Sequence, residues 1–416
     1  MVEKLAIHGG PKVKATPFGS GKRFGEAELK ELREAIEQDT LFYHYGQKVK
    51  QFLQKFNEMY GVKYSVATSS GTAAIHVALG AAGVTAGDEV ITSPITDQGT
   101  VIGILYQNAI PVFADVLPNT YNLDPASVEA CITERTKAIV VVHLAGNPCD
   151  MDAIMTIARK YGLKVIEDCA QSYLSMYKGK LVGTFGDYGC FSTNDFKHIS
   201  TGDGGMVTVN SGDDEDYAVV HAFADKNYQR FDHIVARDIH HIAPNYRMTE
   251  LQGAVGIAQL DKLPWICEKR RDYGTMLIDG LTGIPGVYPP QITDGGTSSF
   301  WFFLFRLDMK MLNGTVDEFV AALNAEGISS VRGYIPQPVY MQPLFQKKEA
   351  YPGTHYPFSL SEVSYEEGIC PEAERILKSS VRFGISEFYT ESDIEDIIAS
   401  IRKVAAYFMT AGVTKS

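Results

Sequence analysis

The feature that most constrains the fold is a regular alternation of two hydrophobic patterns between residues 60 and 210. Short apolar runs typical of buried strands alternate with amphipathic segments typical of helices. Successive strands joined by helices return to one sheet in parallel, so the pattern predicts an α/β fold with a mainly parallel sheet and helices on both faces. The predicted strands are 64–67, 89–92, 111–115, 138–143 and 164–168, and the clearest helices are 73–82 and 152–160.

The length of 416 residues exceeds one ordinary hydrophobic core and predicts two domains. A long apolar helical pattern over 246–263 ends before Pro264, and we expect the domain boundary there. The larger domain would comprise residues 1–263, with an N-terminal arm over about residues 1–25, and the smaller domain residues 264–416. A strand at 301–307 and helices at 315–326 and 391–406 predict an α+β arrangement for the smaller domain.

Composition argues against several classes of function. Hydrophobic residues make up 45% of the chain and charged residues 21%, and no apolar run is long enough to span a bilayer. The net charge of −12 includes no basic block, so we expect no nucleic-acid partner. Without a recognisable export signal, a cytoplasmic protein with no membrane contact is expected. The six scattered cysteines form no Cys-x-x-Cys pair, so we expect reduced thiols and no metal site.

A short polar segment follows the first predicted strand. Ser69-Ser-Gly-Thr-Ala-Ala74 places small residues and hydroxyls before a helix, where backbone N–H groups and the helix dipole attract an anion. The small side chains also let a phosphate approach the backbone. The same segment is an ordinary helix N-cap, so on its own it does not identify a phosphate site.

Asp168 and Lys197 are the candidate catalytic residues. Asp168 ends the predicted strand 164–168, where a carboxylate can pair with a protonated pyridine nitrogen; a solvated turn or helix cap explains a single aspartate at least as well. Lys197 lies in a polar, glycine-rich turn, five residues after Ser192. A lysine whose ammonium is destabilised by burial or a nearby cation readily forms a Schiff base with an aldehyde, whereas a lysine taken at random is a surface residue.

In combination, these features point to one cofactor. A phosphate cradle, a strand-end acid and a loop lysine, in that order along the chain, are what pyridoxal 5′-phosphate (PLP) requires. A second polar segment, Asn245-Tyr-Arg-Met-Thr-Glu250, begins the long helix and could either meet a phosphate or cap the helix. We therefore predict a PLP enzyme.

Several separate segments between about residues 40 and 265 resemble the DegT/DnrJ/StrS family. This family comprises PLP-dependent aminotransferases of keto sugars and keto cyclitols, within the fold-type I aspartate aminotransferase superfamily. The resemblance implies a seven-stranded sheet in the large domain. The matching segments are Ser69-Ser-Gly-Thr-Ala-Ala, Gly87-Asp-Glu-Val-Ile, Pro111-Val-Phe-Ala-Asp, Ile132-Thr-Glu-Arg-Thr-Lys-Ala-Ile, His143-Leu-Ala-Gly, Ile166-Glu-Asp-Cys-Ala-Gln, Phe191-Ser-x4-Lys197, Gly202-Asp-Gly-Gly and Asn245-Tyr-Arg-Met-Thr-Glu-Leu-Gln.

The resemblance also implies roles for individual residues. Lys197 would form the Schiff base with PLP, and Asp168 would pair with the pyridinium nitrogen. Gln171 would lie near the phenolic oxygen of the cofactor. Asn245 would reach the phosphate of the neighbouring subunit, which predicts a homodimer with shared active sites. The residues that would hold the phosphate within one subunit are Ser70, Gly71, Thr72, Ala73 through its backbone, and Ser192.

The chain departs from the family pattern at one position. Within Ser93-Pro-Ile-Thr-Asp-Gln-Gly-Thr100 the family usually carries an aromatic residue that stacks on the cofactor ring, and the alignment places Asp97 there. An exposed turn acid, or an alignment shifted by one or two residues, would explain this equally. A carboxylate beside the ring could instead contact a hydroxyl or an amine of the substrate.

By resemblance, the expected activity is transfer of an amino group from glutamate or glutamine to a keto sugar, nucleotide-linked or free, or to a keto cyclitol, in amino-sugar, polysaccharide or antibiotic biosynthesis. A sugar dehydratase of the same family carries histidine in place of the lysine, and a one-residue shift in register would put His198 there. A non-catalytic PLP-binding accessory protein is the other alternative. The sequence does not identify the ketone, the carbon aminated or the donor.

Overall fold

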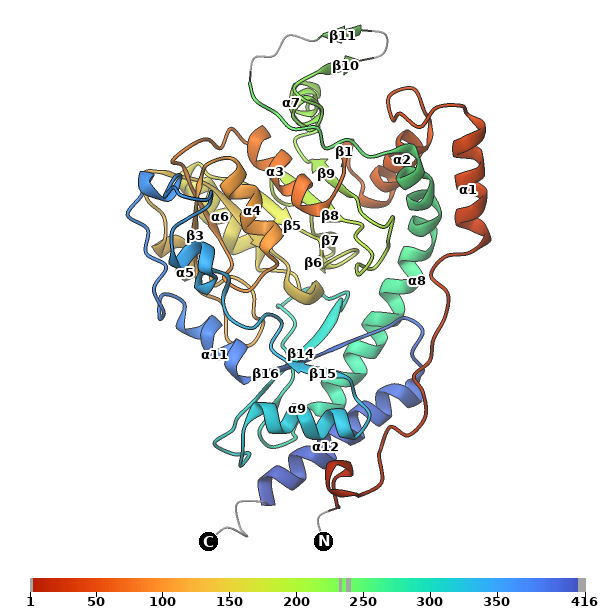
Figure 1. The fold of residues 1–416 in the computed structure, drawn as a ribbon, viewed down its shortest axis with the longest axis vertical. Helices are drawn as coiled ribbons and strands as arrows, with labels where there is room; N and C mark the ends of the chain where they lie inside the picture. Colours follow the sequence, from red (N-terminus) through yellow and green to blue (C-terminus); the bar gives the residue numbers. More distant parts are fainter. Residues whose placement is uncertain (1–2, 232–233, 237–240, 411–416) are drawn as a thin grey trace.

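The computed structural model describes residues 3–231, 234–236 and 241–410, and its central feature is a seven-stranded sheet in the order β1-β9-β8-β5-β4-β2-β3 (Figure 1). Strands β8, β5, β4, β2 and β3 are parallel to one another, whereas β9 is antiparallel to β1 and β8. The predicted α/β fold with a mainly parallel sheet is therefore confirmed. The strands are β1 (Tyr64–Thr68), β2 (Glu89–Thr92), β3 (Ile110–Phe113), β4 (Thr136–Val142), β5 (Lys164–Asp168), β8 (Tyr188–Ser192) and β9 (Gly205–Val209).

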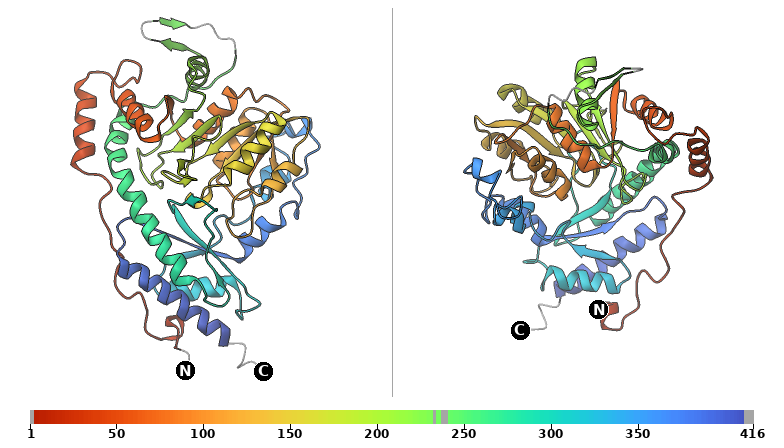
Figure 2. Two further views of the ribbon diagram at one scale, coloured as in Figure 1. Left: turned by 180° about the vertical axis from the view of Figure 1, so that it is seen from behind. Right: turned by 45° about the horizontal axis from the view of Figure 1, so that its top comes forward.

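Helices cover both faces of this sheet, which is why its strands are apolar throughout. Side chains alternate along β4, so Val140 packs in a cluster with α3 (Gly71–Ala81) and α7 (Asp214–Ala224), while Ile139 and Val141 pack with α5 (Pro125–Ala130) and α6 (Met151–Tyr161) on the other face. The view from behind in Figure 2 shows α6, in yellow, over that second face. Helix α2 (Lys48–Tyr60) also packs on this second face, near β1 and β8, and α4 (Gln98–Tyr106) lies against α3.

The long helix α8 (Glu250–Leu281) corrects the prediction that a helix ends before Pro264. A proline inside a helix leaves one carbonyl without its N–H donor and costs roughly 3 kcal/mol. Packing on both sides of the proline offsets this cost, because each half of the helix is buried in a different core. The first half contributes Leu260, Leu263 and Ile266 to the cluster beneath the central sheet, and the second contributes Tyr273, Leu277 and Leu281 to a C-terminal cluster.

Beyond α8 the chain forms a smaller antiparallel sheet in the order β12-β14-β16-β15, below the central sheet in Figure 1. Its strands are β12 (Val287–Tyr288), β14 (Phe302–Leu307), β15 (Ser330–Arg332) and β16 (Ser380–Gly384). The associated helices are α9 (Val316–Ala325), α11 (Pro371–Ser379) and α12 (Glu391–Thr410). The predicted strand and both predicted helices of this region are present. Because α8 runs through residue 264, the division of the chain there stays a prediction.

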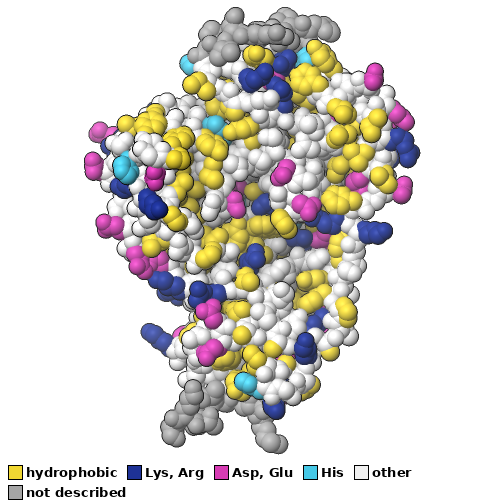
Figure 3. All heavy atoms as spheres, viewed as in Figure 1, with side chains coloured by type: hydrophobic (Ala, Val, Ile, Leu, Met, Phe, Trp, Pro, Cys, Tyr) yellow, Lys and Arg dark blue, Asp and Glu magenta, His cyan; other side chains and the backbone are white. Residues whose placement is uncertain are grey.

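The remaining α-helices and strands are short or peripheral. They are α1 (Glu26–Glu37), α10 (Pro343–Gln346), β6 (Met176–Tyr177), β7 (Lys180–Leu181), β10 (Gln229–Phe231), β11 (Ile234–Ala236) and β13 (Gly296–Thr297). Among the described helices, none has both the length and the apolar character needed to cross a bilayer. On the face shown in Figure 3, acidic and basic side chains are interspersed rather than gathered by sign.

The N-terminal arm runs from α12 along α8 to α1 (Figure 1) and is fastened by a buried ion pair. Lys14 Nζ lies 2.6 Å from Asp393 Oδ1, with 3% and 4% of the two side chains exposed. Burial alone would raise the pKa of Asp393, but hydrogen bonds from Lys14 and from the N–H groups of Thr390 and Gly19 outweigh it and lower the pKa to about 2. Since the ordinary value is 3.8, this pair stabilises the fold fully above about pH 4 and loses its effect as the pH falls through 2.

We expect Asp393→Asn to lower the free energy of unfolding at pH 7 by about 3 kcal/mol, because Lys14 would keep only the longer pair with the partly exposed Asp396 (3.1 Å) as its counter-ion. Urea unfolding followed by circular dichroism measures the change. The double variant Lys14→Met/Asp393→Asn is the control and should recover most of the loss, because it removes the buried charge while the amide oxygen still accepts from the N–H groups of Gly19 and Thr390. Equal stability of Asp393→Asn and wild type would contradict this account.

Candidate active site

A cavity of about 250 Å³ opens at the carboxyl ends of β5 and β8, where ligands bind in open α/β sheets. It brings together eight of the ten residues that the sequence analysis selected. Ala73 and Asn245, both described residues, lie outside the lining. The lining residues are Ser70, Gly71, Thr72, Asp97, Asp168, Gln171, Ser192 and Lys197, together with Ile75, Gly99, Thr100, Ala170, Asn194 and Asp203.

The anion cradle is the N-terminus of α3, which follows β1 after a short turn. Ser70 is its N-cap, and the Oγ of Ser70 accepts a hydrogen bond of 3.0 Å from the N–H of Ala73. Glycines let this turn approach β8 and β9 closely: a Cβ on Gly71 would lie 2.6 Å from the Cβ of Ser192, and a Cβ on Gly205 would lie 2.4 Å from the carbonyl oxygen of Ser70. The cradle thus gathers hydroxyls and first-turn N–H groups at the positive end of a helix dipole.

Asp168 is an acid held in a fixed orientation at the end of β5. The residue is only 6% exposed, and its two carboxylate oxygens accept hydrogen bonds from Thr100 Oγ1 (2.8 Å) and the N–H of Ala170 (3.1 Å). Burial raises the pKa of Asp168 and nearby Asp97 adds to the effect, whereas the two hydrogen bonds and Lys197 oppose it. A buried carboxylate in this position is stabilised by any cationic N–H group that reaches it.

Lys197 is half-buried, and its loop is held by side chains from two distant parts of the chain. Burial lowers the pKa of Lys197, while the negative charges of Asp168 and Asp97 counteract it. The guanidinium of Arg23, from the N-terminal arm, donates to the carbonyl oxygens of residues 195, 197 (2.7 Å) and 198 (3.3 Å). The indole N–H of Trp301 donates to the carbonyl oxygen of residue 196 (2.7 Å). Sequence analysis missed Arg23 and Trp301, because nothing local marks either residue as a contact of this loop.

His198, the alternative reactive residue, faces away from the cavity. It is fully buried, and its Nε2–H donates to the carbonyl oxygen of Ser299 (3.1 Å). Lys197, and not His198, lines the cavity. The structure therefore gives no support to a shift of register that would make His198 the reactive side chain.

Gln171 connects the cavity to the C-terminal sheet. Its side-chain oxygen accepts from the N–H of Ala145 (2.8 Å), and its amide nitrogen donates to the hydroxyl of Tyr334 (3.2 Å). Burial and the charges of Asp97 and Asp168 raise the pKa of Tyr334. Tyr334 is therefore a neutral hydroxyl group beside the cavity and a third residue that the sequence analysis missed.

Asp97 lies at the exposed edge of the cavity as the N-cap of α4, where its Oδ1 accepts a hydrogen bond from the N–H of Gly99 (2.8 Å). Asp97 is therefore an exposed acid, as one of the alternative explanations holds, and it also caps a helix. It is also close enough to influence the titration of Asp168, Lys197 and Tyr334. Any ligand in the cavity therefore experiences its negative charge.

Among the described residues, one buried group has the composition of a metal site: His143, Glu167 and Cys169. The polar side-chain atoms of His143 and Glu167 are already engaged in hydrogen bonds. The N–H of Cys149 donates to Nδ1 of His143 (3.0 Å), so the Nε2–H of this ring donates to Glu167 (3.0 Å). Glu167 also accepts three backbone N–H groups from residues 183, 185 and 186. These bonds hold a turn against β5, and they use the lone pairs that a metal would need.

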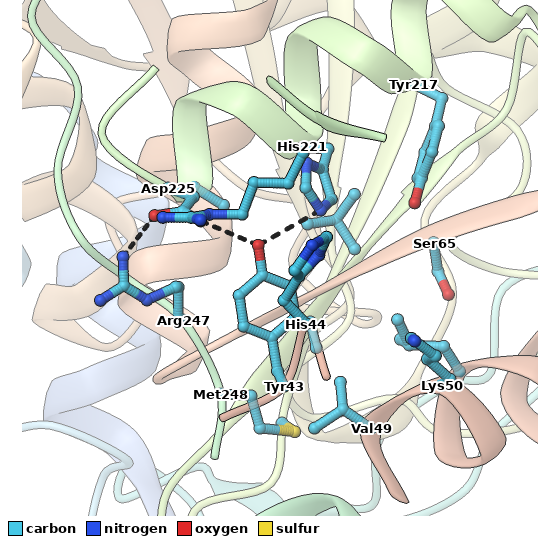
Figure 4. Close-up of a pocket in the computed structure, with 15 residues that line it drawn as sticks. Tyr43, His44, Val49, Lys50, Ser65, Tyr217, His221, Asp225, Arg247 and Met248 are labelled. Atoms are coloured by element: carbon cyan, nitrogen blue, oxygen red, sulfur yellow. Dashed lines mark hydrogen bonds and ion pairs between the residues drawn. The ribbon is translucent and has the colours of Figure 1, made fainter. Parts of the chain in front are cut away.

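A larger cavity of about 410 Å³ lies beside β1, between α2 and α7 (Figure 4). In its wall, Asp225 pairs with Arg230 (2.5 Å) and Arg247, and accepts a hydrogen bond from Tyr43 (2.8 Å). Asn245 forms an isolated β-bridge with Asp225 and therefore lies near this wall rather than with Lys197. Its predicted contribution to the site of a neighbouring subunit stays a prediction.

Comparison with known proteins gives a consistent result. A sequence model of the DegT/DnrJ/EryC1/StrS aminotransferase family matches residues 22–402. A putative L-glutamine:3-amino-2,3-dideoxy-scyllo-inosose aminotransferase of Streptoalloteichus tenebrarius is 37% identical, over 79% of each chain. GDP-perosamine synthase of Caulobacter vibrioides is 38% identical, over 68% of this chain and 76% of that protein. The X-ray structure of an aminotransferase from Psychrobacter cryohalolentis superposes with a TM-score of 0.84 at 30% identity, covering 94% of this chain and all of the other.

We expect Arg23→Gln to loosen the Lys197 loop, because three carbonyl oxygens would lose a charged donor. Losing such bonds should speed amide hydrogen exchange in residues 194–201 by about tenfold or more. Mass spectrometry of peptic peptides measures the exchange. The arm itself should stay attached, because the backbone oxygen of Arg23 is bound by Gln259 and Lys262. Unchanged exchange in 194–201 would count against the role of Arg23.

Proposed function

The chain belongs to the DegT/DnrJ/EryC1/StrS aminotransferase family, and on this premise we propose that it uses PLP to carry an amino group from glutamate or glutamine to a keto sugar or a keto cyclitol. The observation that carries the proposal is the meeting of Lys197, Asp168 and the α3 cradle in one cavity. Two relatives support the class of acceptor, because the name of one includes a cyclitol ketone and the name of the other a GDP-linked amino sugar.

The residues present fit PLP. The first turn of α3, Thr72 and Ser192 offer neutral donors to a phosphate, Asp168 offers a carboxylate to the ring nitrogen, and Lys197 offers an amine to the aldehyde. Gln171 is placed to bond a polar group of the cofactor. When bound, PLP supplies an aldehyde that accepts amino groups and a ring that draws electrons from the substrate carbon.

The chain's own residues would divide the work. Lys197, whose pKa is lowered by burial, is neutral in a larger fraction of molecules than an exposed lysine, so its Nζ can take a proton from the donor and return it. Asp168, fixed by Thr100, would keep a positive charge on the ring nitrogen. Asp97 would bind a hydroxyl or an amine of the substrate at the cavity edge.

The described lining of the cavity contains three carboxylates, Asp97, Asp168 and Asp203, but only one cation, Lys197. A phosphate held there would be bound more strongly if a further hydrogen-bond donor contacted it. We propose that Asn245 of a second copy supplies it, so that the working form is a homodimer with shared sites. A cytoplasmic location is also part of the proposal.

The covalent link provides the first test. Wild-type protein treated with PLP should show an absorption band near the visible edge, and borohydride reduction should leave a phosphopyridoxyl group on the peptide containing Lys197. Lys197→Ala should lack both. The exposed Lys178 serves as a matched control, and Lys178→Ala should behave as wild type. A reduced adduct on any other lysine would refute the assignment.

A second test concerns Asp168. We expect Asp168→Asn to retain PLP but to lose amino transfer by at least about a hundredfold, because a neutral amide cannot stabilise a charged ring nitrogen. The measurement follows ¹⁵N from labelled glutamine or glutamate into keto-sugar and keto-cyclitol acceptors. Asp203→Asn, which removes an exposed carboxylate from the same cavity, should cost little. Failure of wild type to exchange nitrogen with any donor would favour an accessory protein.

A further inference from the structure

The ammonium of Lys197 rests on an aromatic ring. Nζ lies 3.8 Å from the ring centroid of Trp301, and the indole N–H of the same side chain donates to the carbonyl oxygen of Phe196 (2.7 Å). The Trp301 side chain thus contacts both the ammonium group of Lys197 and the backbone of the residue that precedes it. Trp301 directly precedes β14 and belongs to the C-terminal sheet region, so this contact joins the two sheets at the reactive amine.

Trp301 is itself held firmly. Its backbone N–H donates to the carbonyl oxygen of Ala145 (2.9 Å), and its own carbonyl oxygen accepts from Arg270 (3.3 Å). Arg270 is in turn paired with Glu387 at 2.7 Å, with 9% and 2% of the two side chains exposed. The indole ring also contacts the rings of Phe302 and Tyr334. The position of the ring is therefore set by bonds that do not involve Lys197.

We propose that Trp301 positions Lys197. The face of its indole ring is the binding position, here called the seat, of the Lys197 ε-ammonium whenever this amine is not bonded to the cofactor. The inference rests on the proposed function, in which the amine is released and needed again in every turnover. A lysine side chain is long and flexible, so a released amine that moved freely would return to the reacting carbon only in a fraction of its conformations. The ring face restricts it to one region, while the bond to Phe196 fixes the base of the side chain.

An aromatic seat suits this purpose better than a carboxylate. A ring attracts an ammonium through its quadrupole but accepts no proton, and the attraction is weaker than that of a desolvated ion pair. The amine can therefore leave the ring without breaking a strong bond. The charged and titratable groups that face the amine and the ring are Asp168, Asp97, Tyr334, Arg23, Arg270 and the neighbouring His198.

The test is nuclear magnetic resonance of the full-length protein labelled with ¹³C at the ε-carbon of lysine, first without added cofactor. Protons above an aromatic face resonate upfield, so the ε-methylene signal of Lys197, assigned with Lys197→Arg, should lie upfield of the other lysines. Trp301→Leu should abolish the upfield shift. The protein has one other tryptophan, Trp265, and Trp265→Phe is the matched control that should leave the signal in place.

Two further variants separate the two contacts of the indole. Trp301→Phe keeps a ring face but loses the N–H, so the upfield shift should persist while amide exchange in residues 194–201 becomes faster. In Trp301→Leu the Lys197 signal should also titrate at a lower pH than in wild type, by about one pH unit, because the ring favours the charged amine. Asp97→Asn should lower the titration midpoint as well, but without moving the ring-shifted signal.

The outcomes distinguish this inference from the proposed function. If the Lys197 signal lies at the same position in wild type and Trp301→Leu, the inference that the ammonium rests on Trp301 is wrong, whatever the activity of the protein. If the signal is ring-shifted but does not change on addition of PLP, the seat stands and the proposed covalent role of Lys197 fails. A shift lost in Trp301→Leu, kept in Trp265→Phe and released by PLP supports both.

Discussion

The structure of the candidate site depends on the restraint of four consecutive carbonyl groups around Lys197. A loop of this kind is normally hydrated and mobile, because its backbone groups have no strand or helix to bond them. Here Arg23 and Trp301 bind the carbonyl oxygens of residues 195–198, so the loop is fixed from the N-terminal arm on one side and the C-terminal sheet on the other. The buried pair of Lys14 and Asp393 fastens the same arm to α12. The N-terminal arm and the C-terminal sheet, far apart in the sequence, thus both hold the Lys197 loop in place.

The charge balance of the cavity follows from the same arrangement. Three carboxylates line it, yet Lys197 is the only cation among its described lining residues. Neutral donors, the first-turn amides of α3 and the hydroxyls of Thr72 and Ser192, therefore have to stabilise an anion. The ammonium of Lys197 meanwhile lies against the ring of Trp301.

The sequence predicted the parts of the site that depend on local pattern. Asp168 ends an apolar run, Ser70 precedes a helix, and Lys197 lies in a glycine-rich turn, so each could be placed from its neighbours and from the family resemblance. Arg23, Trp301 and Tyr334 could not, because each meets the site only through tertiary contacts across more than a hundred residues. Pro264 is the opposite case: the local rule ends a helix there, and burial of both halves of α8 overrides the rule.

At Asp97 the sequence departs from the family pattern, and aromatic side chains from a distant part of the chain lie near the same site. Where the family resemblance predicts an aromatic residue, this chain has a carboxylate that caps α4 at the edge of the cavity. Aromatic rings reach the site from the C-terminal sheet region instead, through Trp301 under the lysine and Tyr334 beside Gln171. Neither ring is among the described residues that line the cavity, so both act on it through the side chains they contact, Lys197 and Gln171. The described lining itself is mostly polar and includes Asp97, Thr72 and Asn194, so it offers hydrogen bonds to hydroxyl or amino groups of a ligand.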